Sequence, residues 1–193
     1  DQTLKLARDE IAANRLWNNP AALTAALEKY SPHLEEIITV SFVMPDGLSI
    51  AQSNPAIPTG RRYVDFGYFK FHSTHPADDP FVEPPFVGPA SGQRVFTMSR
   101  ALRSRQGELQ GILVAAVRTD VIAREFAELR IGNNGSIGFH HLPSYRILAR
   151  QPDHEGTFGR DIGHAGLETA LAKAPIGAFE GAISADKVER LFA

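Results

Sequence analysis

The sequence predicts an α+β fold in which an antiparallel sheet is flanked by helices. Apolar residues recur at steps of three to five near the N-terminus, three pairs of β-rich segments are joined by turns, and helix-forming segments lie between these pairs. Strands joined by short turns pair antiparallel, and the sheets that they form bury at least one face under other elements.

Residues 4–27 predict either a long N-terminal helix or two helices that are broken near residue 18. Their apolar positions follow the period of a helix among good helix formers. Asn19 is a suitable N-cap for a second helix, with Pro20 in its first turn.

The first predicted sheet consists of two strand pairs with a short aromatic helix between them. Turn residues end residues 37–43 before residues 48–52 resume, and Gln106-Gly107 separates residues 94–102 from residues 109–117. Such spacing is typical of hairpins. The aromatic helix spans residues 66–73 with Asp65 as its cap, and Pro-bearing loops flank it.

The remaining residues repeat this theme in a shortened form. Residues 119–129 predict a helix, residues 136–140 and 146–150 a strand pair, and residues 167–174 a second helix. Two further strands are expected within residues 178–183 and 188–192. Because the chain stops just after the last strand begins, we expect a second unit that is truncated at its end.

Composition excludes several classes of protein. The 193 residues include 20 Lys and Arg against 22 Asp and Glu, which gives a net charge of −2 and argues against binding nucleic acid or an anionic membrane surface. Cysteine is absent, so disulfides, thiol nucleophiles and thiolate metal sites are excluded. The apolar run at residues 111–117 is far shorter than the roughly 20 residues of a membrane span. A first residue of Asp suggests a piece of a longer gene product.

Several motifs, taken in order, resemble the extracytoplasmic double Cache, or PDC, sensor domains. Residues 65–72 (DFGYFKFH) look like the family's Asp-Arg-x-Tyr-Phe-x-x-His segment, and residues 86–92 (FVGPASG) look like its Gly-Pro approach to the central hairpin. Residues 98–113 match its Ser-Arg and Gly-x-x-x-Gly hairpin pattern most clearly. Residues 126–135 and 147–152 resemble the linking segment and a motif of the second unit.

The resemblance implies a helical stalk at residues 1–29, a membrane-distal unit at residues 30–118, and a linker helix with an incomplete membrane-proximal unit at residues 119–193. It further implies a periplasmic location, anchored in the inner membrane by transmembrane helices outside this sequence. A small molecule bound in the distal unit would act on a cytoplasmic output domain, with diguanylate cyclase favoured and a histidine kinase or chemoreceptor as the alternative. The chain itself would not be an enzyme.

The stripe formed by Leu4, Ile11 and Leu16 has two interpretations. It is either the surface through which the N-terminal helix forms a homodimer, or the face with which this helix packs on its own sheet.

In this family the ligand pocket lies between the sheet and the helix that covers it. Aromatic rings exclude water around a solute, and arginine offers a planar fork of donors to an anion. The alternative is that the aromatic residues belong to the core and that the arginine pairs with a structural acid such as Asp65. The residues that the resemblance assigns to ligand binding are Tyr68, Phe69, His72 and Arg100, with Arg62 and Tyr63.

Amino-acid-binding members of this family carry an Arg and an Asp at positions that hold Phe66 and Ala116 here. A ligand ammonium group would have no acid to pair with, which is costly in a dry site. We therefore expect that the chain is not a standard amino-acid receptor, and that a short organic anion fits better.

No cofactor, catalytic residue or metal site is predicted. Ser99 lies outside any Gly-x-Ser-x-Gly elbow, and no phosphate-binding glycine loop occurs. A small metal-dependent enzyme would need His72, His75 and Asp79 to converge. A stand-alone periplasmic binding module is the other rival.

Overall fold

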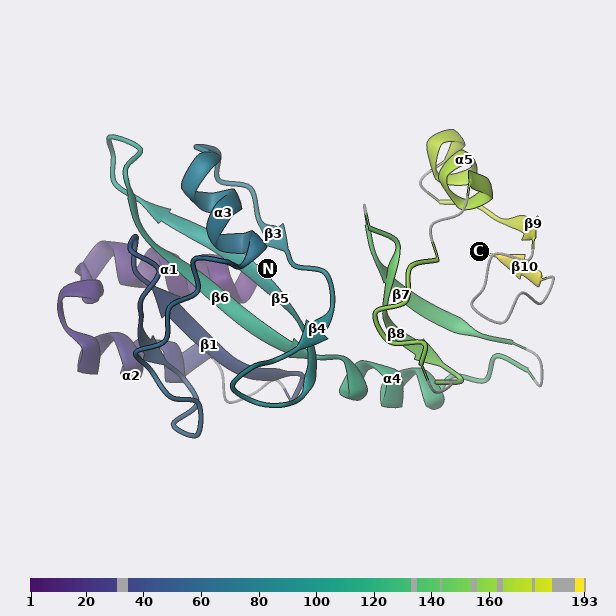
Figure 1. The fold of residues 1–193 in the computed structure, drawn as a ribbon, viewed down its shortest axis with the longest axis horizontal. Helices are drawn as coiled ribbons and strands as arrows, with labels where there is room; N and C mark the ends of the chain where they lie inside the picture. The colour runs from purple at the N-terminus through teal and green to yellow at the C-terminus, as the bar shows by residue number, and fades with distance from the viewer. Residues whose placement is uncertain are drawn as a thin grey trace. The chain divides into compact units, whose positions relative to one another are not determined.

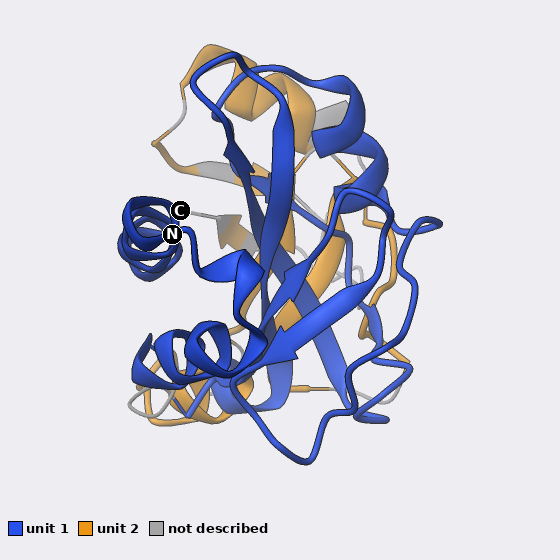
Figure 2. Ribbon diagram, turned by 90° about the vertical axis from the view of Figure 1, so that its left-hand side faces the viewer, with its two compact units in different colours: residues 1–122 blue, residues 123–193 orange. Residues whose placement is uncertain are grey.

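The computed structural model describes residues 1–30, 35–132, 135–142, 144–153, 156–162, 165–174, 176–181 and 190–192. The chain divides into two compact units, residues 1–122 and residues 123–193, shown in separate colours in Figure 2. Helices and antiparallel strands make up both units, which confirms the predicted α+β class.

Unit 1 is built on a six-stranded antiparallel sheet with the order β2-β1-β6-β5-β3, in which β4 also pairs with β5 (Figure 1). Its centre is the long hairpin of β5 and β6, which agrees with the predicted pair. The strands are β1 (Ile37–Val43), β2 (Ser49–Gln52), β3 (Phe81–Val82), β4 (Phe86–Val87), β5 (Arg94–Arg103) and β6 (Leu109–Arg118).

The N-terminal segment forms two helices, as one of the two predictions had it. They are α1 (Gln2–Asn14) and α2 (Pro20–Tyr30), joined by the 3-10 turn η1 (Leu16–Asn18). Asn19 caps α2, because its side-chain oxygen accepts the backbone N–H of Ala22 at 3.2 Å.

Each face of the sheet is covered by a different layer. Helices α1 and α2 pack on one face around Val40, Phe42 and Leu113. On the other face, α3 (Gly67–Thr74) and its flanking loops cover Val43 and Val114. Since side chains alternate along a strand, the parity of a residue on β1, β5 or β6 decides which layer it meets.

The stripe on α1 packs on its own sheet. Leu4 and Ile11 are buried in the core cluster that contains β1 and β6, and Leu16 packs against that cluster. The stripe is therefore unavailable as a dimer surface, which removes the observation behind the predicted homodimer.

The loops around α3 differ from the prediction in two respects. The two-residue strand β3 lies in the Pro-bearing loop that follows the aromatic helix, whereas β4 begins the segment that resembles the approach to the central hairpin; both strands pair with β5. Asp65 does not cap α3, whose first amide groups bind a glutamate that lies 16 residues further along the chain from Gly67.

Unit 2 contains the hairpin of β7 (Ile137–His141) and β8 (Arg146–Gln151), the helix α5 (Ala165–Lys173), and the short pair β9 (Phe179–Gly181) and β10 (Arg190–Phe192). Helix α4 (Thr119–Ala127) contains the boundary between the units. These elements lie where the sequence predicted them, with bounds shifted by one or a few residues.

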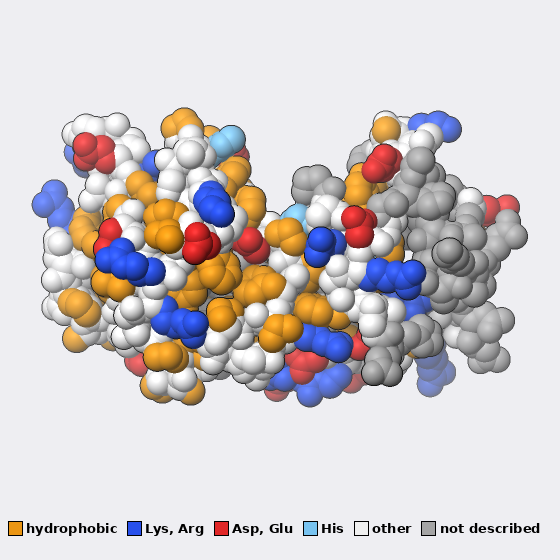
Figure 3. All heavy atoms as spheres, viewed as in Figure 1, with side chains coloured by type: hydrophobic (Ala, Val, Ile, Leu, Met, Phe, Trp, Pro, Cys, Tyr) orange, Lys and Arg blue, Asp and Glu red, His pale blue; other side chains and the backbone are white. Residues whose placement is uncertain are grey.

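Among the described helices, none combines the length and the apolar character that crossing a membrane requires. On the face of unit 1 drawn in Figure 3, basic and acidic side chains are interspersed. This face therefore carries no extended field of one sign, as the net charge of −2 led us to expect.

Candidate functional site

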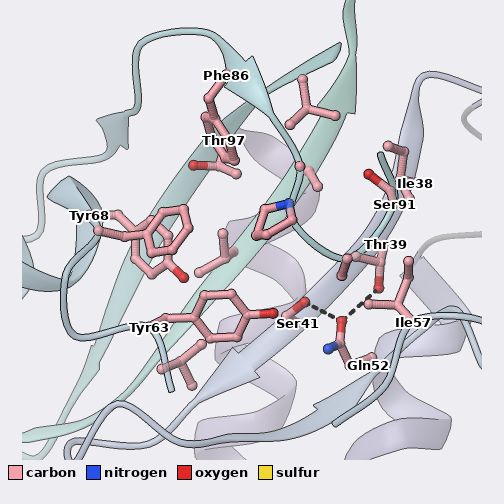
Figure 4. A pocket seen from close by; sticks show the side chains of 18 residues that line it. Ile38, Thr39, Ser41, Gln52, Ile57, Tyr63, Tyr68, Phe86, Ser91 and Thr97 are labelled. Atoms are coloured by element: carbon pink, nitrogen blue, oxygen red, sulfur yellow. Dashed lines mark hydrogen bonds between the residues drawn. The ribbon is translucent and has the colours of Figure 1, made fainter. Parts of the chain in front are cut away.

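A cavity of about 70 Å³ lies in unit 1 between the sheet and the loops around α3 (Figure 4). A site for one water molecule needs roughly 10–15 Å³, so this cavity has room for a small solute. Its sheet wall is formed by residues of β1, β5 and β6 that include Thr39, Ser41, Thr97, Val114 and Ala116.

The opposite wall is aromatic. Phe66 lies at the centre of this wall, with its ring centroid 5.4 Å from that of Tyr63 and 5.6 Å from those of Tyr68 and Phe86. Two of these contacts, those with Tyr63 and Phe86, are edge-to-face, an arrangement that is favourable for aromatic rings. The four rings therefore form a continuous apolar surface over the cavity.

Polar groups of the sheet wall are held in place by one glutamine. The Gln52 carboxamide oxygen accepts the Ser41 hydroxyl at 2.7 Å and lies 3.4 Å from that of Thr39 (Figure 4). Its amide nitrogen donates to the Pro58 carbonyl at 3.0 Å and to the Ser49 hydroxyl at 3.3 Å. Gln52 is 4 % exposed, so this network is rigid and has its partners within the protein.

Thr97 differs from these groups. It is 5 % exposed and lines the cavity, yet its hydroxyl has no hydrogen-bond partner among the residues that the structure describes. Ala116, which is paired with Thr97 across β5 and β6, offers no polar side chain. An unpaired buried hydroxyl is costly, and a partner within the cavity would relieve that cost.

Glu83 fixes the covering helix above the cavity. Its two carboxylate oxygens accept the backbone N–H groups of Gly67 at 3.0 Å and Tyr68 at 2.8 Å. The charge also lies at the positive end of the α3 dipole. Gly67 permits this approach, because a Cβ atom there would lie 2.7 Å from Oε1 of Glu83.

Two of the six residues predicted to bind a ligand line this cavity, Tyr63 and Tyr68. Figure 4 shows both rings extending into it. Burial raises the pKa of Tyr68, with the neighbouring Tyr63 and the charge of Glu83 as smaller causes. The Tyr68 hydroxyl is therefore a neutral donor and acceptor throughout the physiological pH range.

Arg100, which the resemblance assigns to the pocket, is not among the residues that line this cavity. On β5 it has the parity of Met98 and Leu102, which pack toward the N-terminal helices. Its guanidinium group binds both carboxylate oxygens of Asp1, at 2.6 and 3.0 Å, and the backbone oxygen of Asp78 at 2.7 Å. This agrees with the alternative interpretation that Arg100 pairs with a structural acid, but the acids are Asp1 and Asp78 and not Asp65.

His72 is fully buried between α3 and β5 and lies outside the cavity wall. Its Nε2 lies 2.9 Å from the hydroxyl of Ser99, which itself lies 3.3 Å from the Phe81 carbonyl oxygen. If Ser99 donates to that carbonyl, then Nε2 donates to Ser99 and Nδ1 is unprotonated. Burial lowers the pKa of His72 to about 4, and Arg103 and Arg100 add to this effect, so the ring is neutral at pH 7.

The other two predicted residues also lie outside this cavity. Phe69 packs against the core cluster beneath α3. Arg62 is exposed and forms an ion pair with Asp46, with 3.2 Å between Nη1 and Oδ2. Ligand binding by the six predicted residues therefore stays a prediction, which the geometry favours for Tyr63 and Tyr68.

Beyond the two tyrosines, the sequence indicated two positions of the cavity wall through a different argument and did not indicate the others. Phe66 and Ala116, the positions at which the resemblance implied charged residues in amino-acid-binding members, both line the cavity. Thr97 and Ser41 were not singled out. Alternation along β1 and β5 was the available signal, but it does not tell which face is covered by α3.

The histidines that could have formed a metal site have other contacts. His75 stacks on Phe71 with 4.5 Å between ring centroids, while His72 turns to Ser99. Within the described ranges, no three His, Asp or Glu side chains converge on a point that could hold a metal ion.

Comparison with known proteins gives structural matches only. No protein-family model matches the chain, and neither does any curated protein. The extracellular domain of rpHK1S-Z16, which is assigned as a histidine kinase, has a TM-score of 0.81 at 23 % identity over 98 % of this chain and 80 % of that one.

Two chemoreceptor domains are also similar. The ligand-binding domain of CtaA from Pseudomonas fluorescens, solved with L-isoleucine, has a TM-score of 0.66 at 14 % identity, covering 98 % of this chain and 73 % of that one. That of Tlp3 from Campylobacter jejuni, solved with 4-methylisoleucine, has a TM-score of 0.60 at 17 % identity, covering 98 % and 75 %. The chain therefore has the fold of the extracellular ligand-binding domains of histidine kinases and chemoreceptors, the Cache fold that its motifs indicated.

Proposed function

We propose that this chain is the extracytoplasmic ligand-sensing part of a membrane-bound signalling receptor, with the cavity of unit 1 as its ligand site. The observation that carries the proposal is this cavity, which lies between a rigid sheet and an aromatic cover. Its location supports the proposal, because a solute there would contact both the sheet and the loops around α3.

The signal would pass through transmembrane helices outside this sequence to a cytoplasmic domain, so the chain itself would bind and not catalyse. The motifs favoured a diguanylate cyclase output, for which the comparisons give no support. We propose a histidine kinase output because the domain with a TM-score of 0.81 is assigned to a histidine kinase. A chemoreceptor is the second candidate, favoured by the two chemoreceptor domains.

Residues 1–29 would then lead from a first membrane helix, residues 30–118 would form the membrane-distal unit, and residues 119–193 the membrane-proximal one. Helices α1 and α2 pack on the sheet of unit 1, so movement of that sheet would reach the N-terminal helices directly. A ligand shifts such an equilibrium only by binding one state more tightly than the other.

The proposal is tested by ligand-induced stabilisation of the 193-residue chain. The panel consists of the L-amino acids, short carboxylates, and short amides and alcohols. At least one member should raise the unfolding temperature and change the output of the full-length receptor. Ala116→Phe, which fills the cavity from β6, should abolish both effects. Ala12→Phe, at an exposed position of α1, should leave both effects unchanged.

A panel without any stabilising member would contradict the proposal, and so would a ligand whose effect survives Ala116→Phe. Circular dichroism checks that this variant folds. Ala90→Phe, on the loop that lines the same cavity, serves as a second blocking variant.

A further inference from the structure

We infer that the ligand of the unit 1 cavity is uncharged, with an apolar body against the aromatic wall and a hydrogen-bonding group directed at Thr97. This inference rests on the proposed function and names the chemical class of its ligand. It replaces the short organic anion that the sequence favoured, because the arginine and histidine behind that hypothesis lie elsewhere.

The first argument is the absence of charge on the cavity wall. No Asp, Glu, Lys, Arg or His is among the described residues that line it. An ion that leaves water for a site without a counter-charge loses hydration which the site cannot replace. A carboxylate, an ammonium ion or a zwitterionic amino acid is therefore disfavoured.

The second argument is that three titratable groups on elements next to the cavity have other partners. Glu83 accepts two backbone N–H groups of α3. Arg100 lies on the opposite face of β5 and binds Asp1 and Asp78. His72 is held by Ser99 and is neutral at pH 7. A charged ligand could recruit one of these groups only by breaking contacts that hold the fold together.

The third argument is Thr97, a residue of the cavity wall whose buried hydroxyl has no partner among the described residues. A hydroxyl can donate and accept, so it suits a neutral alcohol, ketone or amide. The Tyr68 hydroxyl is likewise a neutral donor and acceptor on the wall, whereas Gln52 already binds Ser41, Ser49 and the Pro58 carbonyl.

The fourth argument is the shape of the remaining wall. The rings of Tyr63 and Tyr68 extend into the cavity (Figure 4), and those of Phe66 and Phe86 also line it. A cavity volume of about 70 Å³ limits the apolar body to a short or compact one. The cavity thus matches a small solute that is apolar at one end and polar at the other.

The test uses four probes of similar shape and different charge: isobutyramide, isobutyrate, isobutylammonium and L-valine. Binding to the 193-residue chain is measured by ligand-detected NMR, with dissociation constants from titration of protein resonances. We expect isobutyramide to bind at least tenfold more tightly than each charged probe. Tighter binding of a charged probe within the cavity would overturn the inference and leave the proposed function intact.

If none of the four probes binds, the inference fails. The proposed function fails as well only if the wider panel of amino acids, carboxylates, amides and alcohols gives no stabilising member. The two failures are therefore distinguishable.

Thr97→Val provides the matched variant, since it keeps the shape of the side chain and removes the hydroxyl. It should weaken isobutyramide binding about tenfold, the value of one well-placed hydrogen bond. The control is Thr119→Val. The hydroxyl of Thr119 is buried outside the cavity and donates to the Arg94 carbonyl at 3.3 Å. Equal affinity of both variants for isobutyramide would overturn the role of Thr97.

Discussion

The guanidinium group of Arg100 donates two hydrogen bonds, of 2.6 and 3.0 Å, to the carboxylate of Asp1, and these bonds connect the central strand β5 with the start of α1. Arg100 is 4 % exposed and also binds Asp78, in the loop that follows α3. Arg8 of α1 pairs with the same Asp78. One buried arginine thus connects the N-terminal helix with the cover of the opposite face.

Arg100→Met should lower the free energy of unfolding by about 1–3 kcal/mol, because it removes charge-assisted hydrogen bonds from a mostly buried site while Asp1 can be partly hydrated. Arg100→Lys should cost less, since it keeps the charge and loses the two-pronged geometry. Urea unfolding measures both. Ligand affinity in the cavity should be unchanged in Arg100→Lys, and its loss without loss of stability would show that Arg100 binds the ligand.

His72 should make unit 1 less stable in acid. Its pKa in the folded protein is lowered to about 4 from 6.5, so the unfolded chain binds the proton more readily and stability falls as the pH falls below about 6.5. Burial is the main cause of this lowered pKa, and the hydrogen bond with Ser99 is the largest opposing effect. Arg103 and Arg100 also lower the pKa, and Asp78 raises it.

The loss between pH 7 and pH 5 should be about 2 kcal/mol. Urea unfolding of the wild type and of His72→Gln, which keeps a donor but does not titrate in this range, measures the difference. NMR titration of the ring gives its pKa directly. A His72 ring resonance that titrates near pH 6.5 would contradict the prediction. His140→Gln is the control in unit 2, where burial also lowers the pKa of a histidine.

Glu83→Ala should destabilise α3 and the cover of the cavity by about 1–2 kcal/mol, the usual loss when an acceptor is removed from a helix N-terminus. Glu83→Gln should lose about half as much, since one oxygen still accepts a backbone N–H. Hydrogen exchange at the amides of Gly67 and Tyr68 should rise first. Unchanged protection there would show that Glu83 does not hold the helix.

Ala116→Asp should destabilise the chain at pH 7 by about 1–3 kcal/mol relative to Ala116→Asn, because no described residue of the cavity wall offers a counter-charge. The pKa of the introduced carboxyl group should rise above the usual 3.9. The loss of stability should therefore develop as the pH rises through that raised value, and it should disappear in acid. Thermal unfolding of both variants from pH 4 to pH 8 measures it. Equal stabilities at pH 7 would mean that the cavity accommodates charge.

The sequence by itself determined the elements and their order. The β-branched runs, the turn residues and the break at Asn19 depend on local backbone preferences, which a single chain segment expresses without help from the rest. The same local signals, read together as motifs, indicated the Cache fold. The short strand β3 was not predicted, because it exists only through pairing with β5.

Only the tertiary structure decided which side chains meet at the cavity. Arg100 and Thr97 lie three residues apart on β5, so alternation sends them to opposite faces, and nothing local indicates which face the α3 loops will cover. Burial under those loops leaves the Thr97 hydroxyl without a partner among the residues that the structure describes, while Arg100 binds an acid 99 residues away in the sequence. Contacts between distant segments therefore decide which side chains line the cavity.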